Sequence, residues 1–440
     1  MNRTLLAVLV ALAAAAAGAG ARAAPRPRVV LISVDGLWAR DLQRAESLGV
    51  RLPVLDSLRR EGAFAAGVIG SFPSVTYPSH TTMVTGVPPA RHGVYSNGRF
   101  FPPTDTTRIA RSYWEAEWVR VPGLFEAARA AGLKTAAVNW PVTAHHGSID
   151  YNIPDAWDPR MPDSVLVALR RLGTPWLLDS LGAPRGGGWS DSLRARWTGE
   201  IVRRWDPDFV LLHLLDLDHW KHEQGPVGDS VWVALRGADR YIGWLLSALR
   251  ERPRATTVIV TSDHGFLPHR QQVRVGVLLA RAGLVTLDSG GRVTAWDAAV
   301  FSNGGSVMIL PRDSTDRGLA ARIRAAIPDS LVGPGRPVRA VWLRDTVAAL
   351  GGDPRALWAL DMNEGFYAAG GYRGALIGDR LGGAHGYDPR RAELHAFFLA
   401  VGPGIRRGSR LPVIRQVDIA PTVAKVLGLR LEGVEGRPVF

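Results

Sequence analysis

The hydrophobic positions of the chain follow two alternating patterns. Five short runs are continuously apolar and rich in β-branched or aromatic residues, which is typical of strands buried on both faces. These runs are residues 28–34, 134–139, 208–215, 256–262 and 395–401. Apolar residues at helical spacing occupy the intervening segments 123–132, 192–205 and 229–250. The alternation predicts an α/β fold, a three-layer α/β/α sandwich with a central, mostly parallel sheet.

One long segment, from about residue 266 to 379, departs from this pattern. It is less regular and contains Pro-, Gly- and Arg-rich stretches such as residues 332–339. The chain has no internal repeat and no low-complexity linker. We therefore expect one domain over residues 24–440, into which the segment inserts as a capping region.

The first 23 residues have a basic start, an apolar stretch and an Ala-Arg-Ala ending. This is the layout of a cleaved secretory signal peptide, and an uncleaved anchor is the alternative. No later stretch is apolar enough over sufficient length to span a bilayer. We expect residues 1–23 to be removed and the mature protein to be soluble and periplasmic or secreted.

Composition narrows the possible chemistry. The chain has no Cys, so a metal site must use carboxylate, imidazole and hydroxyl groups. The formal net charge of +13 favours anionic partners in general. The arginines are scattered, however, without a basic run or an aromatic-interleaved patch, so we expect no specific nucleic-acid recognition. The charge indicates either mild steering of phosphate-bearing substrates or simply an Arg-rich composition.

Acidic residues and histidines follow three of the predicted strands. Asp35 follows the first run, Asp218 the third, and the pair Asp263 and His264 the fourth. The carboxyl ends of parallel strands meet at one edge of a sheet, where the sites of open α/β folds lie. Asp218 and His222 are four residues apart, so both can reach one divalent ion from a single helical turn. The pattern predicts a metal site at this edge.

A nucleophile is expected in the segment 71–97. Pro78 and Gly86 predict a short helix that begins near Thr76 and stops at Gly86. The backbone donors and the positive dipole end of that helix would favour a phosphate and stabilise a Thr76 alkoxide. The alternative is that Thr76 only caps the helix.

Other histidines are interpreted as structural or as neighbours of the site. His80 lies one turn into the predicted helix and His92 in the loop after it. His213 interrupts a buried strand, and we expect it to be a core histidine with a satisfied hydrogen bond.

Five motifs, in this order, resemble the alkaline phosphatase superfamily. They are VDG at 34–36, TYPSHTTMVTG at 76–86 with HGVYSN at 92–97, DLDHWKHEQGP at 216–226, SDHGF at 262–266 and AHGYDP at 384–389. Within that superfamily the chain is similar to the type I nucleotide pyrophosphatase/phosphodiesterases, from about Val29 to Phe440. The resemblance implies a phosphoric diester hydrolase, or nucleotide pyrophosphatase, with two Zn²⁺ per chain.

The resemblance also implies the ligands of both ions. The first zinc, which activates the nucleophile, would bind Thr76 itself together with Asp35, Asp263 and His264. The second zinc, which holds a phosphoryl oxygen and activates water for the second step, would bind Asp218, His222 and His385.

Three further residues are implied to contact the substrate. Asn97 matches the amide that holds a non-bridging phosphoryl oxygen, and Tyr77 matches an aromatic residue that stacks on the base in nucleotide-cleaving members. Trp140, followed by Pro141, resembles a segment that lines the substrate pocket. For Trp140 a packing role is an equal alternative.

The expected function is therefore that of an exported two-zinc enzyme acting on a small-molecule phosphodiester or nucleotide. Thr76 would attack phosphorus and form a phospho-threonine intermediate. A phosphomonoesterase or phosphonate hydrolase on the same site is the main alternative, and a catalytically silent binding protein is another. The chain lacks a Tyr-Lys-x-Arg-like segment of the kind that monoesterase members use, which favours diesters. Neither the leaving group nor the oligomeric state follows from the sequence.

Overall fold

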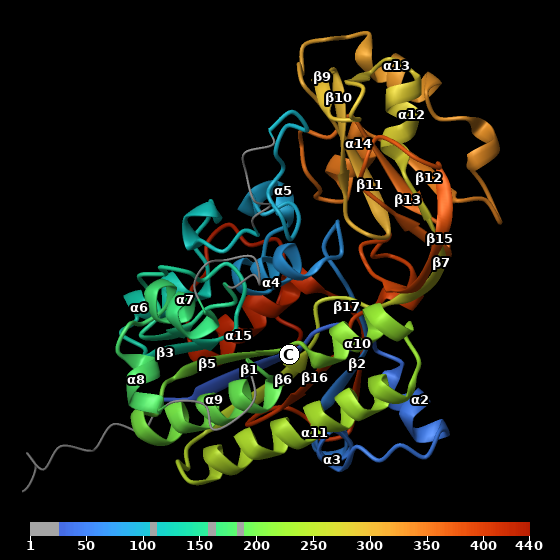
Figure 1. Cartoon of the computed structure of the whole chain (residues 1–440). Helices are drawn as coiled ribbons and strands as arrows, with labels where there is room; N and C mark the ends of the chain where they lie inside the picture. Colours follow the sequence, from blue (N-terminus) through green and yellow to red (C-terminus); the bar gives the residue numbers. More distant parts are fainter. Residues whose placement is uncertain (1–25, 106–111, 157–163, 183–188) are drawn as a thin grey trace, which may run out of the picture.

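The computed structural model describes residues 26–105, 112–156, 164–182 and 189–440, so the expected signal peptide lies outside the described residues. An eight-stranded sheet, in the order β17-β2-β16-β6-β1-β5-β3-β4, forms the centre (Figure 1). Its strands are β1 (Arg28–Val34), β2 (Ala63–Ile69), β3 (Thr135–Val138), β4 (Tyr151–Ile153), β5 (Phe209–Leu214), β6 (Thr256–Thr261), β16 (Phe398–Val401) and β17 (Ser409–Arg415). Every strand pair is parallel except the two that β16 forms with β6 and β2. The predicted mostly parallel sheet is confirmed.

The direction of β16 follows from the path of the chain. After β6 the chain leaves the sheet at its carboxyl edge, and β15 (Ile377–Ala384) brings it back to the same edge. Because β16 enters the sheet from there, it must run opposite to β6. Within the predicted run 395–401, residues Phe398–Val401 thus form a buried strand, but an antiparallel one that begins three residues later than expected.

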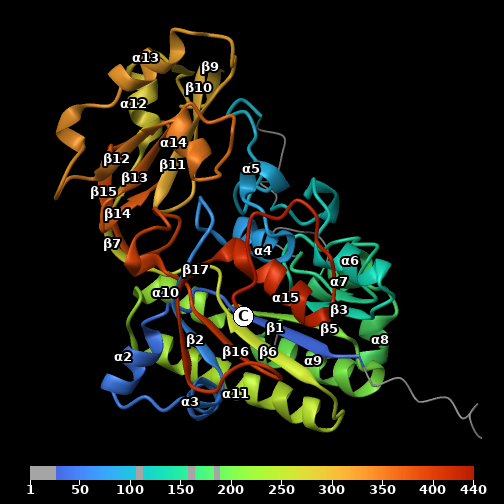
Figure 2. The same cartoon turned by 180° about the vertical axis from the view of Figure 1, so that it is seen from behind.

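Helices cover both faces of the sheet, as Figure 2 shows from behind. On one face Val30 and Ile32 pack with apolar residues of α3 (Pro53–Glu61), α9 (Asp191–Trp205) and α11 (Asp229–Arg250). On the other face Val29 and Leu31 pack with α4 (Thr76–Thr85), α6 (Leu124–Ala130) and α15 (Ile419–Leu427). Successive residues of β1 thus point to opposite helical layers, as expected for a strand buried on both sides.

Shorter helices complete this part of the molecule. They are α2 (Asp41–Ser47), α5 (Pro89–His92), α7 (Val165–Leu172), α8 (Leu177–Leu181) and α10 (Asp216–Gln224). Within the described residues, no helix combines the length and apolar character needed to cross a membrane.

The region between β6 and β16 forms three smaller sheets above the carboxyl edge of the central sheet (Figure 1). The three-stranded sheet contains β14 (Gly365–Ala368), β7 (Leu267–Val273) and β15; the four-stranded one contains β10 (Ala298–Ser302), β11 (Ser306–Pro311), β13 (Trp358–Met362) and β12 (Val338–Leu343). The hairpin β8 (Val285–Leu287) and β9 (Val293–Trp296) and helices α12 (Val275–Arg281), α13 (Leu319–Ala325) and α14 (Arg344–Ala349) complete it. These elements share an apolar cluster of their own. The region is more regular than its sequence indicated, because many of its strands are half exposed and lack a continuous apolar run.

Candidate metal centre and active site

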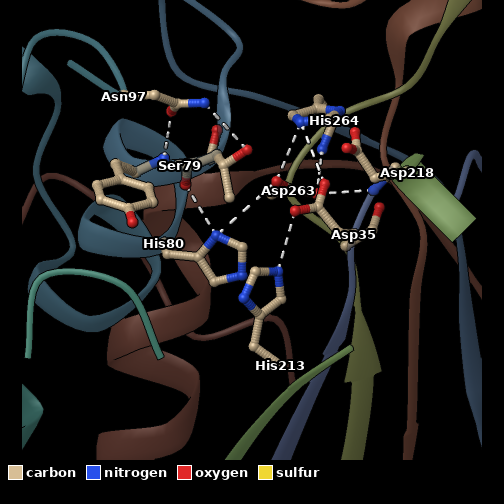
Figure 3. A network of polar contacts seen from close by, with 12 residues as sticks. Asp35, Ser79, His80, Asn97, His213, Asp218, Asp263 and His264 are labelled. Carbon is tan, nitrogen blue, oxygen red and sulfur yellow. Dashed lines mark hydrogen bonds and ion pairs between the residues drawn. The ribbon is translucent and has the colours of Figure 1, made fainter. Parts of the chain in front are cut away.

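The carboxyl ends of the central strands bring the predicted acidic residues together (Figure 3). Asp35 follows β1, while Asp263 and His264 follow β6. His264 Nε2 lies 3.1 Å from Asp263 Oδ2 and 3.4 Å from Asp35 Oδ1. All three side chains are buried. They form the first group of candidate metal ligands.

A second group combines helix α10 with the end of strand β15, which lies in the region between β6 and β16. Asp218 lies in the first turn of α10, His222 in its last turn, and His385 directly after β15. His222 Nε2 is 3.5 Å from Asp218 Oδ2, and His385 Nε2 is 3.8 Å from Asp218 Oδ1. The ring of His264 stacks on that of His385 with a centroid distance of 3.6 Å. Ligand atoms of Asp218, His264 and His385 lie within 4.8 Å of one another, so His264 belongs to both groups, whereas His222 joins the second group through its contacts with Asp218 and His385.

The hydrogen bonds of two histidines fix which ring nitrogens are free. His222 Nδ1 lies 2.9 Å from the carbonyl oxygen of Gly383, and His385 Nδ1 lies 3.1 Å from that of Ser74. A carbonyl oxygen only accepts, so in the neutral ring each Nδ1 carries the proton and each Nε2 presents a lone pair. The two Nε2 atoms are 3.2 Å apart. Two lone pairs this close repel each other unless a cation or a proton lies between them.

Several buried polar atoms of these groups lack a partner. Among the described residues, the atoms that make no hydrogen bond, although some lie within ion-pair distance of one another, include Asp35 Oδ1, Asp218 Oδ1, Asp263 Oδ2 and both ring nitrogens of His264. Unpaired buried polar atoms are costly, and atoms that converge on one point are satisfied together by a cation. Carboxylate and imidazole donors suit zinc. The residues present therefore fit a metal centre.

The pKa shifts of Asp35 and His385 are also consistent with a metal centre. Burial raises the pKa of Asp35 well above its usual range, and the charges of Asp218 and Asp263 raise it further. Burial lowers the pKa of His385 well below its usual range, so the ring is neutral, as a metal ligand must be. A divalent cation would lower the pKa of Asp35 by compensating the clustered negative charge.

Thr76 is the first residue of α4, and the capping position belongs to Val75, whose side chain forms no capping hydrogen bond. The alternative that Thr76 merely caps the helix is therefore wrong. Asn97 Nδ2 donates to Thr76 Oγ1 at 3.4 Å, and Asn97 Oδ1 accepts the backbone N–H of Tyr77 at 2.9 Å. The second bond fixes the orientation of the amide, so that its NH₂ group faces the threonine hydroxyl. Gly86 ends the helix with φ of 71°, as predicted.

His80 connects this helix to the first ligand group (Figure 3). Its Nδ1 lies 2.8 Å from the backbone oxygen of Thr76 and 3.8 Å from Asp263 Oδ2. Burial lowers the pKa of His80 to about 4, so the ring is neutral at pH 7.

His213 is buried, as expected, but it is more than a core histidine. Its Nε2 lies 3.1 Å from Asp35 Oδ2 (Figure 3). Its Nδ1 lies 3.1 Å from the backbone oxygen of Asn139. The contact with Asp35 was missed because it depends on the pairing of β5 with β1, where His213 lies opposite Ser33. The available signal was a polar residue near the carboxyl end of an otherwise apolar strand.

Comparison with known proteins agrees with this geometry. The sequence model of the type I phosphodiesterase / nucleotide pyrophosphatase family matches residues 29–388. The chain belongs to this family.

One relative of the chain is human ectonucleotide pyrophosphatase/phosphodiesterase family member 1, whose sequence is 26% identical to that of the chain over 243 residues. That match covers 54% of this chain but only 23% of the human protein. Mouse family member 7 is 23% identical over 431 residues, which cover 93% of this chain and 85% of the mouse protein.

Solved structures share the fold. Murine ectonucleotide pyrophosphatase/phosphodiesterase 5 superposes with a TM-score of 0.67 at 20% identity, covering 93% of this chain and 97% of the murine one. An inactive form of that protein in complex with AMP superposes with a TM-score of 0.68.

Two residues that the family resemblance implies for substrate contact are largely enclosed in this phosphodiesterase family member. Tyr77 is 7% exposed, and its hydroxyl donates to the backbone oxygen of Asp155 at 3.2 Å. Trp140 is fully buried, with its ring edge-on to that of His80 at 4.8 Å. The burial of Trp140 favours its packing role.

Proposed function

We propose that the chain is a two-zinc phosphodiesterase or nucleotide pyrophosphatase that hydrolyses phosphodiester or pyrophosphate bonds through a phospho-threonine on Thr76. One observation carries the proposal. Thr76 Oγ1 receives a hydrogen bond from Asn97, and through His80 the same helical turn contacts Asp263 of the first ligand group. A hydroxyl held by an amide donor, on a helix that contacts a carboxylate with an unpaired oxygen, has the elements of a metal-assisted nucleophile. Membership of the family supports this activity.

Seven residues would hold the metals. Thr76, Asp35, Asp263 and His264 are proposed for the first ion, and Asp218, His222 and His385 for the second. Two zinc ions, when bound, supply positive charge that stabilises an alkoxide and polarises a phosphoryl group. Three carboxylates and the Thr76 alkoxide contribute four negative charges, so two divalent ions leave the centre roughly neutral and able to accept an anionic ester.

The residues of the chain would then act in two steps. Thr76 Oγ1 attacks phosphorus as the bond from phosphorus to the leaving oxygen breaks, which leaves the phosphoryl group esterified to Thr76. Water then attacks phosphorus, the bond to Thr76 Oγ1 breaks, and the phosphomonoester departs with retained configuration. Asn97 Nδ2 donates to a non-bridging oxygen in both steps, because it already points toward Thr76 Oγ1.

The proposed substrates are small-molecule phosphodiesters or nucleotides. The AMP complex of the murine relative supports a nucleotide. Tyr77, the residue after the nucleophile, is proposed to stack its ring on the base of the substrate. Trp140 is fully buried, so it could touch a substrate only after a rearrangement that exposes its ring. The expected export to the periplasm or the exterior is in keeping with relatives named as ectoenzymes.

Comparing two chromogenic substrates tests the reaction class. We expect the zinc-loaded protein to hydrolyse bis-p-nitrophenyl phosphate faster than p-nitrophenyl phosphate. The reverse order would overturn the diesterase assignment in favour of a monoesterase. Protein that binds two zinc ions and a nucleotide but releases no p-nitrophenol from either compound would be a binding protein instead. A panel of nucleotides and nucleotide sugars would then identify the leaving group.

A further inference from the structure

A buried ion pair lies directly behind the candidate ligands without belonging to them. Lys221 of α10 and Asp41, the first residue of α2, are 2.5 Å apart between Nζ and Oδ2, and neither side chain is exposed. Burial of two opposite charges requires their complete removal from water, which makes such pairs poor stabilisers. A fully buried lysine therefore calls for a second role.

The contacts of the pair suggest what that role is. Lys221 Nζ also donates to the backbone oxygen of Gly36 at 2.9 Å, and Asp41 Oδ2 also accepts the backbone N–H of Trp38 at 2.8 Å. Lys221 immediately precedes the candidate ligand His222, and Gly36 immediately follows Asp35. A single side chain thus connects the helix of the second ligand group to the loop of the first.

Gly36 extends this connection to Asp263. Its backbone N–H donates to Asp263 Oδ1 at 3.0 Å, while its carbonyl accepts from Lys221. Its φ is +67°, and a Cβ at this position would lie 2.7 Å from the ring of Phe266. The residue therefore has to be glycine, and its backbone is held from both sides. Phe266 in turn packs edge-on against the ring of His222 at 5.0 Å.

We propose that Lys221 and Asp41 are positioning residues that hold the ligands on α10 in register with Asp35 and Asp263. The inference rests on the proposed function for the zinc ions that the ligands would hold and for its activity readout. Distances between two metal-binding groups must be held within a fraction of an ångström, and residues that orient ligands typically change metal affinity when they are lost. Lys221 is suited to this because its three donors can fix a carbonyl and a carboxylate at once.

The charges define the variants needed to test it. Asp41 balances Lys221, so Lys221→Met alone leaves a buried aspartate unpaired and should lower the stability of the metal-free protein. The double variant Lys221→Met/Asp41→Asn removes both charges but keeps an acceptor for Trp38. It should regain most of the melting temperature that the single variant loses. The double variant still lacks the hydrogen bond from residue 221 to the backbone oxygen of Gly36, because methionine has no donor.

The experiment measures zinc binding to the metal-free proteins by competition with a chelator, together with Tm, kcat and KM. We expect the double variant to bind at least one zinc about tenfold more weakly than the natural protein and to show a lower kcat with little change in KM. A double variant with natural zinc affinity and kcat would show that the pair only supports the fold. If Lys221→Met fails to fold, the double variant carries the test alone.

A matched control lies at the opposite end of β1. Arg28 and Asp206 form a 2.7 Å ion pair in which the arginine is buried, far from the candidate ligands along the strand. Arg28→Met should lower Tm without changing zinc affinity. An equal loss of zinc affinity in this variant would overturn the proposal, because general loosening would then explain both. Zinc binding needs no substrate, so a failure of the proposed hydrolase activity would leave this result unaffected.

Discussion

The two candidate ligand groups differ in how they are built. The first group, Asp35, Asp263 and His264, lies at the ends of the central strands β1 and β6 and is almost completely buried. In the second group the Asp218 and His222 side chains are 18% and 39% exposed, while the buried His385 follows β15. One group is thus part of the core, whereas the other lies between a surface helix and an inserted region.

This difference has consequences for what each group can do. The buried carboxylates have no solvent to stabilise their charge, so a bound cation should contribute to the stability of the fold as well as to chemistry. In the second group Asp218 and His222 are open to solvent, so a metal bound there would be accessible to water and to a substrate. His264 connects the two, because it lies within reach of both.

The largest effect should come from the residue proposed to react. Thr76→Ala should lower kcat by at least about four orders of magnitude, since it removes the nucleophile, while zinc content stays near two per chain. Metal analysis and initial rates on a diester measure both. Thr85→Ala is the control, because Thr85 lies on the same helix but donates to the backbone oxygen of Thr81. Unchanged activity of Thr76→Ala would eliminate the mechanism.

Removal of a buried ligand should affect the metal and the fold together. Asp263 accepts hydrogen bonds from the backbone N–H groups of Gly36 and His264 in addition to facing the metal centre. Asp263→Ala should therefore abolish activity, reduce zinc content and lower Tm by several degrees, about 1–3 kcal/mol for the backbone donors left unpaired. Calorimetry of the metal-free variant separates the loss of hydrogen bonds from the loss of zinc. An unaltered Tm of the metal-free variant would contradict the structural part of its role.

Removal of a ligand of the second group should affect mainly the metal, because the buried His385 makes one backbone hydrogen bond whereas Asp263 accepts two. His385→Ala should lose one of two zinc ions together with activity, but the Tm of the metal-free protein should fall less than in Asp263→Ala. Elemental analysis and thermal unfolding of both variants, side by side, test the contrast between the groups. Retention of both ions in His385→Ala would show that the assignment of the second site is wrong.

A smaller effect concerns how the free energy of unfolding depends on pH through a histidine outside the metal centre. His92 is fully buried; its Nδ1 accepts the backbone N–H of Val94 and its Nε2 faces Thr82 Oγ1. Burial lowers its pKa to about 3. Between about pH 6.5 and 3 only the unfolded chain binds this proton, so stability falls as the pH falls, by about 1.4 kcal/mol per pH unit.

Replacement of His92 should therefore make the fold less sensitive to acid. From pH 7 to 5, His92→Gln should lose about 2 kcal/mol less unfolding free energy than the natural chain. Urea unfolding of the metal-free proteins at both pH values measures this difference. Metal-free protein is used because competition between protons and zinc at the ligand groups would add a second pH dependence. Equal losses would show that His92 does not contribute.

Much of the central sheet could be predicted from local patterns. Residues 28–34, 208–215 and 256–262 form strands within one residue of the expected ends, because strands buried on both faces need continuous apolar runs. Strands β2, β4 and β17 were missed, and β4 has only three residues. β2 is rich in alanine and glycine, and β17 is an edge strand that contains Pro and three exposed or half-exposed polar residues, so neither has the expected pattern.

The sequence by itself determined which donors are available and where most of them lie. Without cysteine, only oxygen and imidazole ligands remain, and the placement of Asp35 and Asp263 after apolar runs assigns them to one edge of the sheet. Local periodicity determines strand ends, so it also determines the residues that follow them.

Only the tertiary structure decided how the donors meet. His222 and His385 are 163 residues apart, and their contact depends on the return of β15 to the edge that β6 left. The sharing of His264, the contact of His213 with Asp35 and the bond from Lys221 to Gly36 likewise arise from the packing of elements that are distant in the chain. Such contacts leave no periodic signal, because the register between elements is set by side-chain packing across the whole core.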